Sequence, residues 1–120
     1  MKPWTIYHNS SCSNARGALA LLRAHGIEPH IVEYKQTPLT APELRALLAQ
    51  LGVPVRALLR SKEAAYAELN LADAAKDEDE LIAALAAHPE LMQRPVVVAP
   101  SGRAAICRPP EVVLTLIAAA

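Results

Sequence analysis

One short polar segment near the start of the chain holds the residue types that thiol chemistry requires. It contains Cys12, with His8 four positions before it and Arg16 four positions after it. An apolar run over residues 4–7 ends just before the segment, and a helical pattern begins just after it. Backbone N–H groups at a helix N-terminus are unpaired and carry partial positive charge, which stabilises a thiolate and attracts oxyanions. The segment therefore predicts a reactive thiolate at a helix start, placed to meet an anionic substrate.

The individual residues of this loop suggest separate roles. Cys12 is predicted to be the nucleophile rather than a structural cysteine, because its neighbours are serines and asparagines, unlike those of a core residue. His8 is predicted to lower the pKa of the thiol or to orient the loop, although a histidine that only ends the strand fits the same position. Asn9 is either a donor to a bound oxyanion or a turn residue, and the sequence leaves both open. Arg16 and Ser11 are predicted to support the loop.

The second cysteine and the remaining histidines carry no comparable pattern. Cys107 lies in a predicted strand, and the chain has no Cys-x-x-Cys motif, so a structural role is favoured over that of a resolving thiol for Cys12. His25, His30 and His88 lack the spacing of metal ligands. We therefore expect no metal and no bound cofactor.

The overall composition narrows the class of protein. With 120 residues, of which 52 % are hydrophobic and none is phenylalanine, the chain suits one domain with an aliphatic core. Lys and Arg total 12 and Asp and Glu total 12, so the basic footprint of a nucleic-acid or anionic-membrane binder is absent. The sequence shows no secretory segment and no apolar run that could span a bilayer. These features predict a cytoplasmic protein without a disulfide framework.

Hydrophobic patterning indicates the elements that must position the loop. Strand patterns at residues 4–7 and 30–34 flank a helical pattern at 14–25, and this order implies a parallel pair with a right-handed crossover. Glycine follows the helix at Gly26, where a C-terminal cap favours it. These residues predict a βαβ unit with Cys12 between its first strand and its helix.

The rest of the chain is predicted to be a helical middle followed by a ββα unit. Thr40 with Glu43, and Asp77 with Glu80, have the pattern of capping boxes at two helix starts. The order of elements predicts an α/β protein with a thioredoxin-like, mixed four-stranded sheet, in one domain over residues 1–120 with a helical insertion at about 40–90. The expected elements are helices from Thr40 to Gly52, over 54–59, over 61–68 and from Asp77 to His88, strands over 95–99 and 104–107, and a last helix from Pro110.

The chain resembles the glutaredoxin-coupled arsenate reductases over nearly its full length. The active-site pattern of that family is His-x3-Cys-x3-Arg directly after the first strand, and it matches His8, Cys12 and Arg16. Three further blocks resemble the family in the same order and at similar spacing. These blocks are Val55–Arg60, Arg94–Val98 and Cys107–Pro109.

The resemblance implies an oxidoreductase that reduces arsenate to arsenite and serves arsenical resistance. Cys12 would attack arsenate, glutathione as co-substrate would resolve the adduct, and the partner glutaredoxin would reduce the mixed disulfide that results. Three arginines hold the oxyanion in the family, and the matching positions are Arg60, Arg94 and Arg108. Thioredoxin-like folds also place a cis-proline opposite the active cysteine, so we predict a cis peptide bond before Pro95.

Two departures and two alternative functions accompany this resemblance. Ser10 stands where the family usually has proline, and Ala15 where it often has serine. A redox-sensing transcription regulator of the same fold, which binds RNA polymerase, is one alternative, but such relatives usually carry Cys-x-x-Cys in this loop. A thiol oxidoreductase with another substrate is the second. The tyrosine-phosphatase type of reductase is excluded, because its loop needs five residues between cysteine and arginine, and Arg16 follows Cys12 after three.

Overall fold

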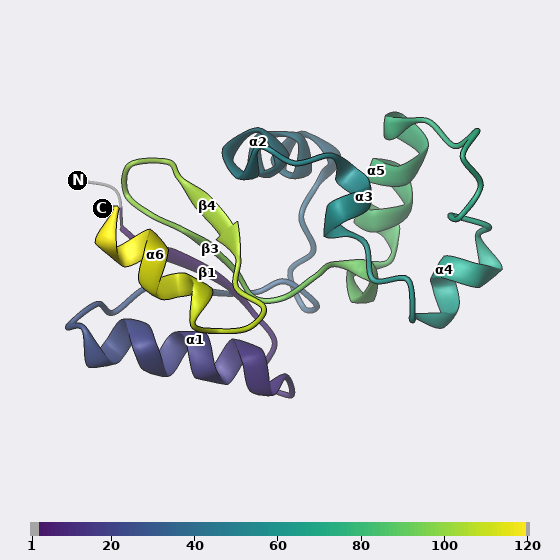
Figure 1. The fold of residues 1–120 in the computed structure, drawn as a ribbon. Helices are drawn as coiled ribbons and strands as arrows, with labels where there is room; N and C mark the ends of the chain where they lie inside the picture. Colours follow the sequence, from purple (N-terminus) through teal and green to yellow (C-terminus); the bar gives the residue numbers. More distant parts are fainter. Residues whose placement is uncertain (1–2, 120) are drawn as a thin grey trace. The chain divides into compact units, whose positions relative to one another are not determined.

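The computed structural model describes residues 3–119 and separates into two compact units. One unit is formed by the two ends of the chain, up to Thr37 and from Arg94 onward. The other is the intervening segment Pro38–Gln93. All four strands belong to the first unit, and the second is helical (Figure 1).

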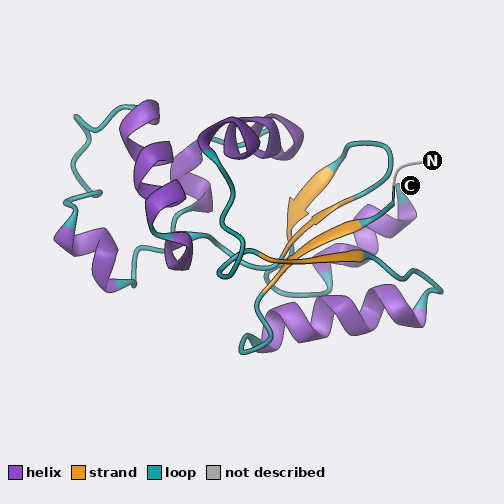
Figure 2. Cartoon of the chain, turned by 180° about the vertical axis from the view of Figure 1, so that it is seen from behind, coloured by secondary structure: helices purple, strands orange, loops and turns teal. Residues whose placement is uncertain are grey.

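The first unit is built on a four-stranded mixed sheet with the strand order β2-β1-β3-β4 (Figure 2). Strands β1 and β2 are parallel, while β3 runs antiparallel to both β1 and β4. This confirms the predicted thioredoxin-like α/β fold class, and the strand ends differ from the expected ones by at most one residue. Strand ends depend on ladder hydrogen bonds, which hydrophobic patterning locates only approximately. The strands are β1 (Thr5–His8), β2 (His30–Glu33), β3 (Val96–Val98) and β4 (Ala104–Ile106).

Helices α1 (Ser13–Ala24) and α6 (Val112–Ala118) cover the same face of this sheet. Ile6 of β1 lies opposite Val97 of β3, so both side chains point to one face, and both are fully buried. They form one core cluster with Leu22 of α1 and Val113 of α6. Burying this aliphatic cluster anchors α1 along β1, with the loop around Cys12 at the start of the helix.

The helical unit contains four α-helices and a short 3-10 turn. Both predicted capping boxes are present, with Thr40 and Glu43 at the first helix and Asp77 and Glu80 at the last. The first of these helices ends at Gly52, whose φ of 67° is a left-handed conformation that glycine adopts without strain. The elements are α2 (Ala41–Leu51), α3 (Val55–Leu58), α4 (Ala64–Glu68), α5 (Glu78–Ala87) and η1 (Pro89–Leu91). Within residues 3–119, every helix is too short or too polar to cross a bilayer.

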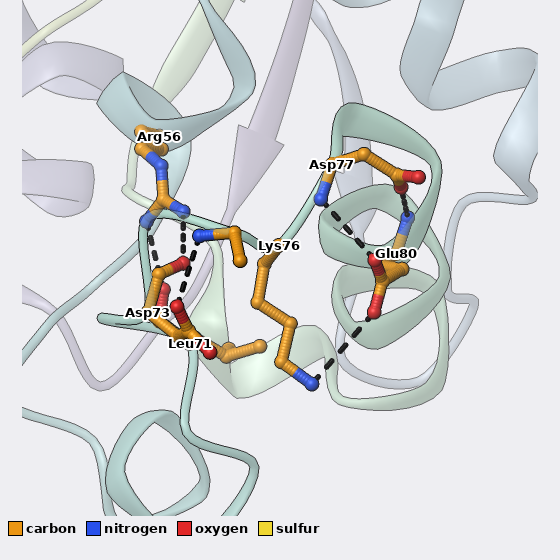
Figure 3. A network of polar contacts seen from close by, with 7 residues as sticks. Arg56, Leu71, Asp73, Lys76, Asp77 and Glu80 are labelled. Atoms are coloured by element: carbon orange, nitrogen blue, oxygen red, sulfur yellow. Dashed lines mark hydrogen bonds and ion pairs between the residues drawn. The ribbon is translucent and has the colours of Figure 1, made fainter.

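Arg56 of α3 organises the irregular segment between α4 and α5 (Figure 3). Its Nη1 donates to the Leu71 carbonyl at 2.7 Å, and its Nη2 donates to the Asp73 carbonyl at 2.8 Å. The Asp73 carboxylate in turn accepts from the backbone N–H of Ala75 at 2.9 Å. The Arg56 guanidinium thus donates hydrogen bonds to two backbone carbonyls that have no helix or strand partner in this irregular segment.

We expect Arg56→Ala to lower the free energy of unfolding by about 1–3 kcal/mol, because two carbonyl groups lose charge-assisted hydrogen bonds. Urea unfolding measures this loss. Arg45→Ala is the matched control, since Arg45 pairs with Asp79 on an exposed surface where an ion pair contributes little. Equal losses in the two variants would contradict the role of Arg56.

Candidate active site

The loop between β1 and α1 is a tight turn that places Cys12 at the N-cap of the helix. The backbone N–H of Cys12 donates to the Asn9 carbonyl at 2.9 Å, and the Asn9 side-chain oxygen accepts from the N–H of Ser11 at 3.0 Å. The Cys12 carbonyl accepts the first helical hydrogen bond, from Arg16 at 3.0 Å. This turn ends β1 and starts α1, as the sequence pattern predicted, with the thiol at the junction.

Arg16 ties the first turn of the helix to the loop. Its Nη1 donates to the Ser10 carbonyl at 2.8 Å, which is the geometry of a residue that supports the loop. Asn9 is 8 % exposed, and its side-chain oxygen is already engaged by the turn, so only its amide N–H groups remain to meet a ligand. The structure thus shows Asn9 as a turn residue, while its role as a donor to an oxyanion stays a prediction.

His8 is the last residue of β1 and directly precedes this loop. Its side chain is 5 % exposed, and among the described residues its Nδ1 has no hydrogen-bond partner. A buried imidazole nitrogen without a partner is costly. The geometry therefore gives His8 a free ring nitrogen next to the loop of Cys12, while the role of this residue stays a prediction.

Two of the three predicted oxyanion arginines reach the loop from the other half of the chain. Nη1 of Arg108 donates to Sγ of Cys12 at 3.9 Å and to the Arg94 carbonyl at 3.2 Å. The peptide bond between Arg94 and Pro95 is cis, which confirms the prediction, and the bond between Arg108 and Pro109 is also cis. Arg94 and Arg108 are thus held beside each other and the thiol.

The pKa of the Cys12 thiol is lowered by this environment. Burial by itself raises the pKa, but three groups together outweigh burial: the backbone N–H of Ala15, the guanidinium of Arg94 and the backbone N–H of Asn14. Nε of Arg94 is buried and has no acceptor among the described residues, so it is available to an anion. The arrangement therefore offers a thiolate nucleophile with donors for a tetrahedral oxyanion around it.

Gly17 is a residue that the sequence analysis did not single out. A Cβ atom at this position would lie 3.0 Å from Cγ of Pro110, which is tighter than most real Cβ contacts. The glycine lets the first turns of α1 approach the segment that carries Arg108. A glycine inside a helical pattern was the available signal, since such residues often mark a close approach of another segment.

Cys107 lies in the core of the same unit. It is fully buried, its Sγ lies 3.7 Å from the Ala105 carbonyl, and burial raises its pKa to about 12. Both Cys107 and Cys12 are free thiols. The pKa shifts of the two thiols are opposite because backbone amides and a guanidinium surround Cys12, whereas burial alone acts on Cys107.

At neutral pH we expect iodoacetamide to modify Cys12 much faster than Cys107 in the native protein, because alkylation requires an accessible thiolate. Cys12 is 8 % exposed and has a lowered pKa, whereas Cys107 is fully buried and has a raised pKa. Peptide mass spectrometry over a time course measures both rates. In urea the two cysteines should react at similar rates. Comparable rates in the native protein would show that Cys107 is accessible.

Arg60, the third predicted arginine, belongs to the helical unit and follows α3. Its backbone N–H donates to the Leu91 carbonyl at 2.7 Å, and its side chain is 19 % exposed. Nε and Nη1 are buried without a hydrogen-bond acceptor among the described residues, although Nε lies 3.4 Å from a carboxylate oxygen of Glu63. Over residues 3–119, no group of three or more His, Cys, Asp or Glu side chains could hold a metal ion.

Comparison with known proteins places this geometry in a family. The chain is 46 % identical over 113 residues to an arsenate reductase of Rhizobium meliloti (strain 1021), covering 94 % of this chain and 80 % of that protein. It is 50 % identical over 113 residues to the uncharacterized protein YfgD of Escherichia coli (strain K12), covering 93 % and 94 %. The structure of an arsenate reductase from Vibrio cholerae superposes with a TM-score of 0.91 at 47 % identity, covering 94 % and 96 %. The ArsC family model matches residues 7–116, and the chain belongs to the ArsC family.

Proposed function

We propose that this protein is an arsenate reductase that uses Cys12 as its nucleophile. The observation that carries the proposal is the position of Cys12 at the N-cap of α1, with Nη1 of Arg108 at 3.9 Å from its Sγ. The nearby amides and the Arg94 guanidinium lower the pKa of this thiol. A thiolate with guanidinium groups around it suits attack on a tetrahedral oxyanion. Relatives named arsenate reductase support the choice of arsenate among such anions.

The proposed reaction starts with the Cys12 thiolate. Its sulfur attacks arsenic, an S–As(V) bond forms, and one arsenate oxygen leaves as water after protonation. The thiol of glutathione then attacks the Cys12 sulfur. The electron pair of the S–As bond passes to arsenic, so arsenite leaves and a Cys12–glutathione disulfide remains. Glutaredoxin takes the glutathione through thiol–disulfide exchange and restores the Cys12 thiol.

The second thiol must come from solution in this scheme. Cys107 is fully buried and its pKa is raised to about 12, so it is a poor candidate for resolving the adduct. This observation supports glutathione as the co-substrate. A reducing cytoplasm, where glutathione is kept reduced, is the proposed compartment.

The arginines are proposed to neutralise the anion as charge moves onto it. Arg94 and Arg108 would bind arsenate oxygens next to Cys12, and the amide group of Asn9 would donate a further hydrogen bond. Arg60 is proposed as the third arginine, on the resemblance and on its two guanidinium nitrogens without hydrogen-bond acceptors among the described residues. His8 is proposed to support the thiolate state through its buried ring.

The direct test is arsenite production by purified protein supplied with arsenate, glutathione and glutaredoxin. We expect steady turnover with all three components and none when either glutathione or glutaredoxin is left out. Turnover that continues without glutathione would contradict the proposed resolving step. The absence of arsenite with all components present would contradict the proposed substrate.

A further inference from the structure

The surroundings of the Cys12 sulfur suit a second reaction besides attack on arsenic. Nη1 of Arg108 donates to Sγ of Cys12 at 3.9 Å and also donates to the Arg94 carbonyl at 3.2 Å. Nε of Arg94 is buried and has no hydrogen-bond acceptor among the described residues. Within residues 3–119, neither arginine forms an ion pair with a carboxylate, so no acidic side chain cancels its charge. The sulfur therefore has cationic donors beside it that can serve an oxygen of another reagent.

A hydroperoxide is a reagent whose reaction with a thiolate requires such donors. The thiolate bonds to one peroxide oxygen, and the other oxygen leaves with the electron pair of the O–O bond. Negative charge develops on the leaving oxygen, and a hydrogen-bond donor next to the sulfur stabilises this charge. The lowered pKa of Cys12 favours the thiolate that the attack needs. Hydrogen peroxide is also smaller than a tetrahedral oxyanion, which suits a thiol that is 8 % exposed.

We propose that Cys12 also reduces hydroperoxides, with the guanidinium groups of Arg94 and Arg108 stabilising the leaving oxygen. The Cys12 thiolate attacks the nearer peroxide oxygen, an S–O bond forms and the O–O bond breaks. The second oxygen leaves as hydroxide or alkoxide and takes a proton from water. Sulfur is thereby oxidised to a sulfenic acid, and the peroxide is reduced to water or an alcohol.

The sulfenic acid of Cys12 requires a second thiol from solution. Cys107 is fully buried and its pKa is raised to about 12, so it is a poor candidate for this attack. A small thiol such as glutathione attacks the sulfenic sulfur, displaces its hydroxyl group as water and leaves a mixed disulfide. A second glutathione attacks the glutathione sulfur of this disulfide, which releases glutathione disulfide and restores the Cys12 thiol. The same mixed disulfide ends the proposed arsenate reaction, and only this shared intermediate rests on the proposed function.

The test follows the turnover of hydrogen peroxide by the purified protein with glutathione and without arsenate. Glutathione reductase and NADPH report the glutathione disulfide that forms, after subtraction of the reaction without protein. We expect turnover that Cys12→Ser abolishes and that Cys107→Ala keeps. When glutathione is left out, dimedone, which traps sulfenic acids, should label Cys12, and peptide mass spectrometry identifies the labelled residue.

A comparison of two reagents tests the role of the arginines. Iodoacetamide and hydrogen peroxide both react with the thiolate, but only the peroxide reaction places charge on a leaving oxygen. Arg108→Ala should therefore slow oxidation of Cys12 about tenfold more than its alkylation. A change in the pKa of the thiol alone would slow both reactions to a similar extent. Arg103→Ala removes an exposed arginine between β3 and β4 and should leave the ratio of the two rates unchanged.

Two results would overturn the inference. One is peroxide turnover by the wild type that is no faster than that of Cys12→Ser. The other is an Arg108→Ala protein in which oxidation is slowed no more than alkylation. Arsenite production by the wild type reports separately on the proposed function. Protein that makes arsenite but turns over no peroxide refutes the peroxide reaction alone, while peroxide turnover in a protein that makes no arsenite refutes arsenate reduction alone.

Discussion

Replacement of Cys12 by serine is expected to lower arsenite production at least about a thousandfold. The amides of α1 and the guanidinium of Arg94 lower the pKa of a thiol enough for it to ionise, but a serine hydroxyl stays protonated in the same place. An oxygen at this position also cannot form the mixed disulfide that the proposed reaction leaves on Cys12 when arsenite departs. The assay with glutathione, glutaredoxin and arsenate measures the loss.

The control for this variant is Cys107→Ala, which removes the other thiol of the chain. It should keep the rate of arsenite production, because Cys107 lies in the core without access to solvent. Cys107→Ala should instead lower the free energy of unfolding, because it leaves a small cavity in the core. A Cys12→Ser protein that still makes arsenite, or a Cys107→Ala protein that folds and makes none, would place the nucleophile elsewhere.

Arg94→Ala is the second change with a large expected effect. We expect kcat/KM for arsenate to fall about a hundredfold, because removing one donor to a developing oxyanion typically costs this much. The same change should raise the pKa of Cys12, since the Arg94 guanidinium is one of the groups that lower it. Alkylation of Cys12 by iodoacetamide rises with pH as the thiolate forms. In Arg94→Ala the midpoint of this rise should therefore move to higher pH.

Two variants test whether the effect of Arg94 belongs to the site. Arg94→Lys keeps the charge and loses the planar fork, so it should restore the alkylation midpoint in part while kcat/KM stays low. Arg103→Ala removes an exposed arginine from the turn between β3 and β4 and should change neither quantity. If urea unfolding shows that Arg94→Ala loses stability in proportion to activity, Arg94 is a structural residue.

Features that depend on a few neighbouring residues could be predicted from the sequence. The capping boxes at Thr40 and Asp77 formed because the hydroxyl or carboxylate and its partner lie within one turn of helix. The loop around Cys12 is equally local, since its turn closes through Asn9 and its helix begins at Ser13. The parallel pair of β1 and β2 could be predicted because a strand, a helix and a strand in this order imply a right-handed crossover.

The helical unit shows the limit of local patterning. The helices expected over 54–59 and 61–68 are shorter in the structure, as α3 (Val55–Leu58) and α4 (Ala64–Glu68). Hydrophobic spacing indicated helices there, but it carried no information about the contacts of Arg56 with the carbonyls of Leu71 and Asp73, which stabilise the irregular segment after α4. Hydrophobic periodicity describes residues within a few positions of one another. It therefore does not indicate hydrogen bonds between a long side chain and backbone carbonyls farther along the chain.

The sequence by itself determined the thiol, its helix start and the types of residue available to an oxyanion. Only the tertiary structure decided that Arg108 reaches Cys12 across 96 positions of the chain, and that Arg94 lies beside it. It also lowered the pKa of one thiol and raised that of the other, by surrounding Cys12 with amides and a cation and burying Cys107 in the core. The physical reason is that pKa values depend on charge, hydrogen bonding and burial in three dimensions, which the order of residues specifies only through the fold.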